Sequence, residues 1–451
     1  MSSNADPRRR SVRRHAVAVA ALVVAAMLAV PAAAAAHAVL ETSSPSFGAV
    51  VRAEPHQVTL RYDEEVVPRL AQVSIVTPSG RDLAGAPRVA GTTVTVPVRA
   101  GPHGSYTVRW RMVAADDGHV TEGAFSFGVD AQPVAPAPAQ GLSIPVAPEA
   151  LAWLEFVAIV LAGGVLTFRA AVLVPATRAL GDGPPQRAQV AADGPLAIGV
   201  GIVGAALGLH AALFAFLVGA YPAVGGGISN FVGTEIIPLR VATHSGQAFT
   251  LSSFAWLLAL ALMVGAWCYP RRREPLLALA GLLTLAIAFG LSWASHPAGR
   301  GTLPLAADYV HLLGAALWVG GLIALAMLAG AMRAGGVADR EALFRACLLR
   351  FSALAAPLVA VLAAAAVYLA IRELPNVSAL FHSRYGILIL AKTVTFAVAI
   401  AIAGYHRRSV VPRVAAGASA AGMRRTLTTE AGILLVTLVL AAILNQSAPP
   451  G

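Results

Sequence analysis

The chain has 451 residues, of which 57% are hydrophobic and only 12% are charged, and its mean hydropathy is +0.71. Soluble globular proteins carry about 25% charged residues, so this composition excludes a wholly soluble protein. The formal net charge is +11. Its arginines cluster between apolar runs, and no basic segment is interleaved with aromatic residues, which argues against nucleic-acid binding.

Residues 1–36 have the features of a secretory signal peptide. Several arginines lie between Arg8 and Arg14, and an apolar stretch that is short for a membrane span follows, from Ala16 to Val30. Cleavage after the small residues that end at position 36 would release His37 as the N-terminus of the mature chain. The alternative is that this segment is retained as an anchor helix.

Residues 37–129 are predicted to form an all-β, Ig-like sandwich. The run from Val58 to Tyr62 alternates apolar and polar residues, as does the run from Tyr106 to Met112. This period of two is typical of half-buried strands, and no helical run interrupts the segment. Several short strands in about 90 residues favour a small sandwich. Residues 130–149, rich in Pro and Ala, are predicted to be an extended linker.

Residues 150–447 are predicted to form an all-α polytopic membrane domain of about eight transmembrane helices. Each apolar run is close to the roughly 20 residues that a spanning helix needs. The runs cover about 150–174, 194–218, 249–268, 275–295, 305–329, 352–371, 385–405 and 430–446.

Basic residues give this domain an orientation, because cytoplasmic loops are enriched in arginine and lysine. They cluster after the first, third, fifth and seventh runs: Arg169, Arg178 and Arg187; Arg271, Arg272 and Arg273; Arg333, Arg340, Arg345 and Arg350; and Arg407, Arg408, Arg413, Arg424 and Arg425. These loops are therefore predicted to be cytoplasmic. The β-domain and both ends of the mature chain are then extracytoplasmic, on a multi-pass protein of the cytoplasmic (inner) membrane.

Three residues of the β-segment form a candidate metal site. A freed His37 offers an α-amine beside an imidazole, and Asp117 and His119 are two apart, so an extended chain points both to one face. Nitrogen and oxygen donors without thiolate suit tetragonal Cu(II). The alternative is that Asp117 and His119 belong to a hydrophilic surface turn and that His37 is a frayed terminus.

The segment from His37 to Val129 resembles the bacterial copper-resistance protein C family. The resemblance is carried by HAVLETSSPSFGAVV, VTLRYDEEV and YTVRWRMVAADDGHVTEGAFSFGV, in that order. It implies a periplasmic β-sandwich that binds Cu(II) through an N-terminal His and a D-x-H motif. Those positions are His37, Asp117 and His119 here.

Ionisable and polar residues in the outer half of the spans are candidates for a membrane copper path, because such residues are costly in lipid. They are Glu155, His210, His296, Asp308, His311 and Trp318. The alternative for each is an interhelical contact with a structural role. Towards the cytoplasmic ends lie soft sulfur ligands suited to Cu(I), at Met263, Cys268, Met327 and Cys347. Their alternative role is to fill gaps between packed helices.

The membrane region resembles the copper-resistance protein D family through SHPAG, DYVHLLGAALWVGGL and SRYGILILAKT. This resemblance implies copper movement across the inner membrane, usually as uptake. The fused chain is therefore expected to bind Cu(II) outside and pass copper to its own membrane domain, in copper homeostasis or resistance. Copper, with Cu(I) an option inside the membrane, and the lipid bilayer are the expected partners.

Two other functions follow from the same residues. Membrane histidines such as His210, His296 and His311 are able to ligate haem, which would make a cupric reductase. The N-terminal His with a second His also resembles the copper centre of oxidative polysaccharide-cleaving enzymes. No ATP-binding loop or nucleophile motif is apparent, so neither an ATP-driven pump nor an enzyme is the expected function. Transport direction, oxidation state, energy source, copper chaperones and oligomeric state are not determined by the sequence.

Overall fold

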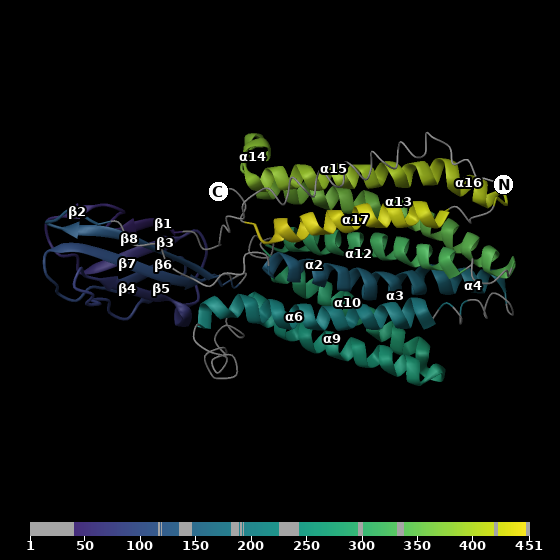
Figure 1. Cartoon of the computed structure of the whole chain (residues 1–451), viewed down its shortest axis with the longest axis horizontal. Helices are drawn as coiled ribbons and strands as arrows, with labels where there is room; N and C mark the ends of the chain where they lie inside the picture. The colour runs from purple at the N-terminus through teal and green to yellow at the C-terminus, as the bar shows by residue number, and fades with distance from the viewer. Residues whose placement is uncertain are drawn as a thin grey trace, which may run out of the picture.

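The computed structural model describes residues 40–115, 118, 120–134, 147–181, 189, 192, 194–224, 243–295, 301–331, 338–418 and 423–447. Within these residues the chain folds as a β-sandwich followed by a bundle of long helices (Figure 1). Eight of the described helices are long and apolar enough to cross a membrane. The predicted fold class, an all-β domain followed by an all-α membrane domain, is therefore confirmed.

The β-domain consists of two four-stranded sheets, with strand orders β1-β3-β6-β5 and β2-β8-β7-β4. The strands are β1 Leu40–Ser44, β2 Val50–Val51, β3 Gln57–Tyr62, β4 Gln72–Val76, β5 Arg88–Ala90, β6 Thr93–Pro97, β7 Gly104–Val113 and β8 Val120–Val129. All neighbouring strands are antiparallel except β2, which runs parallel to the end of β8. The short helix η1, Pro68–Leu70, connects β3 to β4.

Alternation along the strands builds the core of the sandwich. Val58, Leu60 and Tyr62 of β3 are buried, whereas the residues between them are at least partly accessible. On the facing sheet, the ring of Tyr106 stacks on Phe127 with 5.2 Å between centroids. The period-two pattern in the sequence therefore corresponds to one face packed inward and one face turned to solvent.

The membrane domain is built from helices that run back and forth along one axis (Figure 1). The first span comprises α2 Ala147–Ile159, η2 Val160–Gly164, α3 Val165–Phe168, η3 Arg169–Leu173 and α4 Val174–Leu180. The others are η4 Gly194–Gly199 with α6 Val200–Val224, α9 His244–Cys268, η6 Pro270–Arg272 with α10 Arg273–Trp293, α12 Thr302–Ala331, α13 Ala338–Glu373, α15 Arg384–Tyr405 with η8 His406–Val410 and α16 Val411–Ala415, and α17 Met423–Asn445. The short helix α14, Val377–His382, precedes α15.

The first span crosses the fifth at glycines. A β-carbon added to Gly164 would lie 2.3 Å from the carbonyl oxygen of Ala316, and one added to Gly320 would lie 2.6 Å from Cα of Gly164. Only glycine allows this approach, as in other close helix crossings in membranes. The π-helical stretch η2 ends at this crossing. The crossing fixes α12, which carries several candidate residues, against the centre of the bundle.

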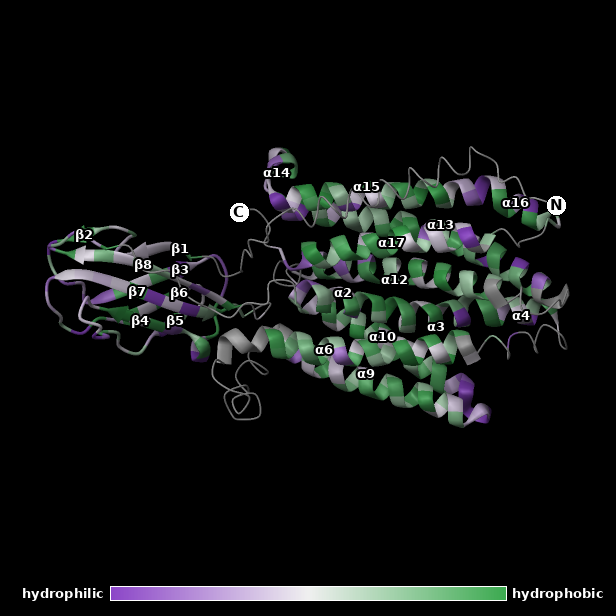
Figure 2. Cartoon of the chain, in the orientation of Figure 1, coloured by the Kyte–Doolittle hydropathy of each residue, from purple (hydrophilic) through white to green (hydrophobic). Residues whose placement is uncertain are grey.

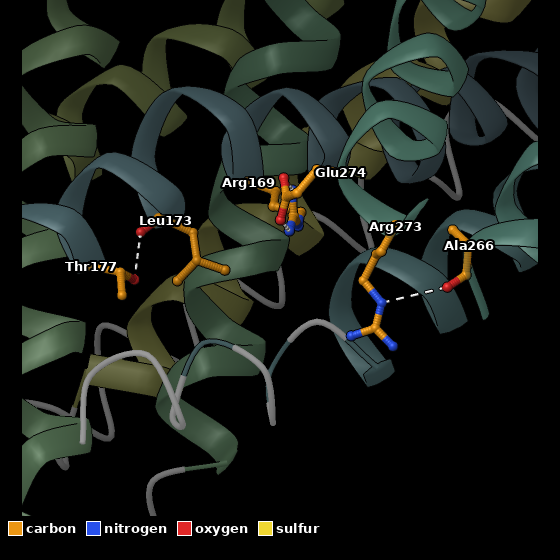
Figure 3. Close-up of polar contacts among 6 residues, drawn as sticks. All are labelled: Arg169, Leu173, Thr177, Ala266, Arg273 and Glu274. Atoms are coloured by element: carbon orange, nitrogen blue, oxygen red, sulfur yellow. Dashed lines mark hydrogen bonds and ion pairs between the residues drawn. The ribbon is translucent and has the colours of Figure 1, made fainter. Parts of the chain in front are cut away.

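The prediction that Arg169 belongs to a cytoplasmic loop is wrong. The first helix continues to Leu180, and Arg169 is buried within it at 4% exposure. Its guanidinium donates to both carboxylate oxygens of Glu274 at the start of α10, one of them at 2.9 Å (Figure 3). Nearby, Arg273 Nε donates to the Ala266 carbonyl at 3.4 Å. The carboxylate partner is what lets a basic residue sit inside the helix bundle.

The arrangement of polar residues agrees with the predicted orientation. Figure 2 shows hydrophilic residues gathered at the ends of α13 and α16 that lie away from the β-domain, and again where α9 meets α10. Those ends carry clustered arginines, including Arg271, Arg272, Arg407 and Arg408. The β-domain lies at the opposite end of the bundle (Figure 1). By the positive-inside rule, the β-domain is on the extracytoplasmic side.

Candidate functional site

The predicted metal ligands His37, Asp117 and His119 lie outside the described residues, but the strands that flank them are described. Leu40, at the start of β1, pairs with Tyr62 at the end of β3. The β7–β8 pairing closes at Val113 and Val120, on either side of the D-x-H motif. The ring of Tyr62 packs edge-on against Trp110 of β7, with 5.6 Å between centroids. The strands that adjoin the candidate ligands therefore meet at one end of the sandwich.

Three acidic residues that the sequence analysis passed over lie at this end of the sandwich. Asp63, Glu64 and Glu65 follow β3 directly. The segment is held to the end of β7, because the Glu65 carbonyl accepts a hydrogen bond of 2.8 Å from the Ala115 amide. Acidic side chains at the same end as a D-x-H motif favour the approach of a cation.

The same end of the sandwich contacts the membrane domain. Val67, Leu70 and Val113 of the β-domain form one buried apolar cluster with Phe216 of α6, and Phe249 of α9 packs against it. We call these five residues the docking patch. Ala115 and Val120, which flank the D-x-H motif, pack against the same cluster. The candidate copper-binding end of the β-domain therefore rests on the outer ends of α6 and α9.

A polar cluster lies in the outer half of the bundle, on α12 and its neighbours. Asp308 accepts a hydrogen bond of 3.2 Å from Ser295, next in sequence to His296, which is outside the described residues. His311 Nδ1 lies 3.2 Å from the carbonyl oxygen of Leu362 on α13. His311 Nε2 lies 3.4 Å from Nζ of Lys392 on α15. Two predicted residues, Asp308 and His311, thus share a polar region contributed by several helices.

Lys392 is a further functional candidate that sequence reasoning missed. It is the only lysine in the chain, and it lies in the middle of an apolar run within SRYGILILAKT. A lone charged residue in a membrane span is a functional candidate by default, so the signal was present. Its partner is on another span, 81 positions earlier in the chain. Only the side-chain contacts between α12 and α15 in the folded bundle identify His311 as that partner.

Glu155 lies at about the depth of this cluster but on the first span. The glycine crossing sets the register of two helices that run in the same direction. Glu155 is nine residues before Gly164 (164 − 155), and His311 is nine residues before Gly320 (320 − 311). Glu155 is 3% exposed, and its Oε1 has no hydrogen-bond partner among the described residues. Such a buried carboxylate oxygen is available to a cation or a proton.

The remaining outer candidates lie apart from the cluster. The His210 side chain is exposed on the surface of α6, and its Nδ1 bonds the Ala206 carbonyl of the same helix at 2.7 Å. Trp318 is buried two turns along α12 from His311, where its ring meets Phe396 of α15 edge-on at 5.8 Å between centroids. His210 has a local partner, and Trp318 has a packing role between two helices.

The four sulfur residues lie on two separate groups of helices. Met263 and Cys268 belong to α9, where Met263 is buried close to Gly201 of α6 and Cys268 is exposed. Met327 is on α12 and the buried Cys347 is on α13, which pack against one another. Helix α9 packs mainly on α6 and α10. The structure therefore does not gather the four sulfurs into one site.

The inner half of the bundle holds a buried pair that the sequence analysis did not single out. His406 Nδ1 lies 3.0 Å from Glu430 Oε2, with the side chains only 8% and 1% exposed. The pair joins η8 to α17. Among the residues that the structure describes, no group of three His, Cys, Asp or Glu side chains is close enough to hold a metal ion.

Comparison with known proteins gives two family matches at separate places along the chain. Residues 40–130 match the CopC domain, and residues 345–444 match the family described as copper resistance protein D. Copper resistance protein D of Pseudomonas syringae pv. tomato is 28% identical in an alignment of 233 residues that covers 47% of this chain and 74% of that protein. The crystal structure of CopC from Methylosinus trichosporium OB3b is 28% identical, with all of that chain and 24% of this chain covered and a TM-score of 0.20.

Proposed function

We propose that this chain, which joins a CopC domain to a copper resistance protein D segment, binds Cu(II) outside the membrane and passes copper to its own membrane domain for uptake. The chain would serve copper homeostasis or resistance as a multi-pass protein of the cytoplasmic membrane. The observation that carries the proposal is the docking patch, which joins the D-x-H end of the sandwich to α6 and α9.

The donor set supports Cu(II) as the ion captured outside. His37 would supply an amine and an imidazole, and His119 and Asp117 would add a second imidazole and a carboxylate. This set of nitrogen and oxygen donors, without thiolate, suits the tetragonal geometry of Cu(II). The acidic run from Asp63 to Glu65 at the same end favours the approach of a cation.

Docking supports direct transfer within one chain. A tethered domain already seated on its acceptor avoids the loss of translational freedom that two separate proteins would incur. Inside the membrane, Asp308 and His311 are the outer residues that would receive copper, and Glu155 lies near their depth on the first span. The Met and Cys side chains nearer the cytoplasmic side would offer soft ligands to Cu(I).

Electron paramagnetic resonance of the purified full-length chain titrated with Cu(II) tests the outer site. We expect one tight tetragonal nitrogen/oxygen signal per chain, lost when one residue is added ahead of His37 and weakened in His119→Ala. His103→Ala is the matched control, because His103 is exposed and pairs with Asp130 at the opposite end of the sandwich. A signal unaffected by the added residue would contradict the N-terminal chelate.

Uptake is tested with the same chain in proteoliposomes that contain a copper chelator. We expect copper to accumulate inside, and to accumulate more slowly in His311→Ala than in the wild type. The purified chain should also show no intense haem (Soret) absorbance band. A haem band would instead favour the reductase alternative, although both ring nitrogens of His311 already have partners in this structure.

A further inference from the structure

The contact between His311 and Lys392 defines which ring nitrogen carries the proton. A carbonyl oxygen only accepts hydrogen bonds, so Nδ1, 3.2 Å from the Leu362 carbonyl, is the protonated nitrogen. In the neutral ring, Nε2 then presents its lone pair to Lys392 Nζ at 3.4 Å. The ammonium has only N–H donors, so it donates to that lone pair.

The lone pair that Lys392 occupies is the one that a metal ion would need. Imidazole ligates copper through the lone pair of an unprotonated ring nitrogen, and His311 has only Nε2 to offer. A hydrogen bond from Lys392 and a bond to copper therefore exclude one another. The ammonium charge also opposes a copper cation at this position, and it does so strongly inside a bundle of low dielectric constant.

Two acidic side chains lie where they attract Lys392 from other helices. Asp308, one turn before His311 on α12, and Glu373, at the outer end of α13, both act electrostatically on the lysine. The lysine side chain is a flexible four-carbon stem with a compact charge at its tip. The residue is partly accessible, and this stem lets the ammonium change partners without a movement of the helix.

We propose that Lys392 is a resident internal cation that occupies the copper position at His311 while the path is empty. Copper arriving at His311 displaces the ammonium towards Asp308 and Glu373, and the returning lysine promotes release of copper from His311. This inference rests on the proposed function, since it concerns copper movement through the membrane domain. It assigns Lys392 a positioning role: it sets how tightly copper is held and how quickly copper leaves.

Substitution of Lys392 by leucine, which has no ligand atom for copper, separates this role from a purely structural one. The full-length chain in proteoliposomes would be supplied with copper alone under reducing conditions, and two quantities measured: equilibrium copper binding and the rate of transfer to an internal chelator. In Lys392→Leu we expect binding about tenfold tighter and transfer about tenfold slower, because the competing charge is gone. His311→Ala in the same background should abolish the added affinity.

Two controls test whether charge is the cause. Thr393→Leu places the same side chain at the next residue of α15, where Thr393 is exposed and bonds its own helix at Ile389, so neither quantity should change. Lys392→Arg retains a positive charge and N–H donors, so its binding should stay close to that of the wild type. Thermal unfolding of each variant checks that the helices still pack.

Other results overturn the inference. Lys392→Leu that binds copper no more tightly than the wild type, or Lys392→Arg that binds as tightly as Lys392→Leu, would contradict displacement by charge. If the wild-type chain transfers copper and Lys392→Leu behaves identically, only this inference fails. If the wild-type chain transfers no copper, the proposed function fails and the inference fails with it.

Discussion

The docking patch makes a prediction about a single side chain, Phe216. This residue is near the outer end of α6, is 9% exposed, and shares a buried cluster with Val67, Leu70 and Val113 of the β-domain. Replacing it with alanine removes the aromatic ring from the centre of the contact. We expect Phe216→Ala to weaken docking of the β-domain without unfolding either domain.

The size of the effect follows from the area that the ring buries. Full burial of a phenylalanine side chain contributes about 1.5–3 kcal/mol. Part of the Phe216 ring would remain buried against α6 and α9 after undocking, so about 1–2 kcal/mol is assigned to docking itself. This loss corresponds to a dissociation constant about 5- to 30-fold higher.

The measurement requires the two domains to be separable. A protease site placed between residues 135 and 146 would be cut in the purified full-length chain, and binding of the released β-domain measured over a range of concentrations. Phe214→Ala is the matched control, because Phe214 is on the same helix but is 52% exposed. If both variants dissociate to the same extent, the patch does not hold the domains together and the reasoning is wrong.

Three further predictions concern packing and ionisation. Gly320→Val should lower the thermal stability of the membrane domain by about 1–3 kcal/mol, because its side chain would overlap Gly164, whereas Gly404→Val, where an added β-carbon meets nothing within 4 Å, should cost less. Equal shifts in unfolding temperature would refute this. Tyr62→Phe should leave the β-domain as stable or slightly more stable, because the buried Tyr62 hydroxyl has no hydrogen-bond partner among the described residues. Tyr106→Phe removes a 2.7 Å hydrogen bond to a carbonyl and should cost about 1 kcal/mol. The reverse order of stabilities in chemical unfolding would contradict this. Burial raises the pKa of Tyr62 above its ordinary 10.0. The Tyr62 hydroxyl therefore stays protonated to a higher pH in the folded state than in the unfolded state. The free energy of unfolding should then fall as the pH rises above 10. Tyr62→Phe should reduce that fall when unfolding is measured over a series of alkaline pH values.

Local patterns were sufficient to predict which elements form and in what order. The alternation around Leu60 and the apolar runs of about 20 residues reflect burial against a core or lipid, which depends on near neighbours in the chain. The arginine clusters likewise gave the orientation. Helix ends were less accurate: the first span continues to Leu180, because Arg169 has a buried carboxylate partner that no local pattern reveals.

Partners across the bundle depended on the tertiary structure. Asp308 and His311 were recognisable as polar residues in a span, but the lysine that occupies His311 Nε2 is 81 positions away on another helix. The docking patch joins Val67 to Phe216, and neither residue is unusual in its own segment. Whether a side chain is buried depends on which face of its own helix or strand it occupies, so the periodicity of apolar residues predicts it. A contact between two helices depends on their register and crossing, which close glycine packing at Gly164 and Gly320 sets only when the chain is folded.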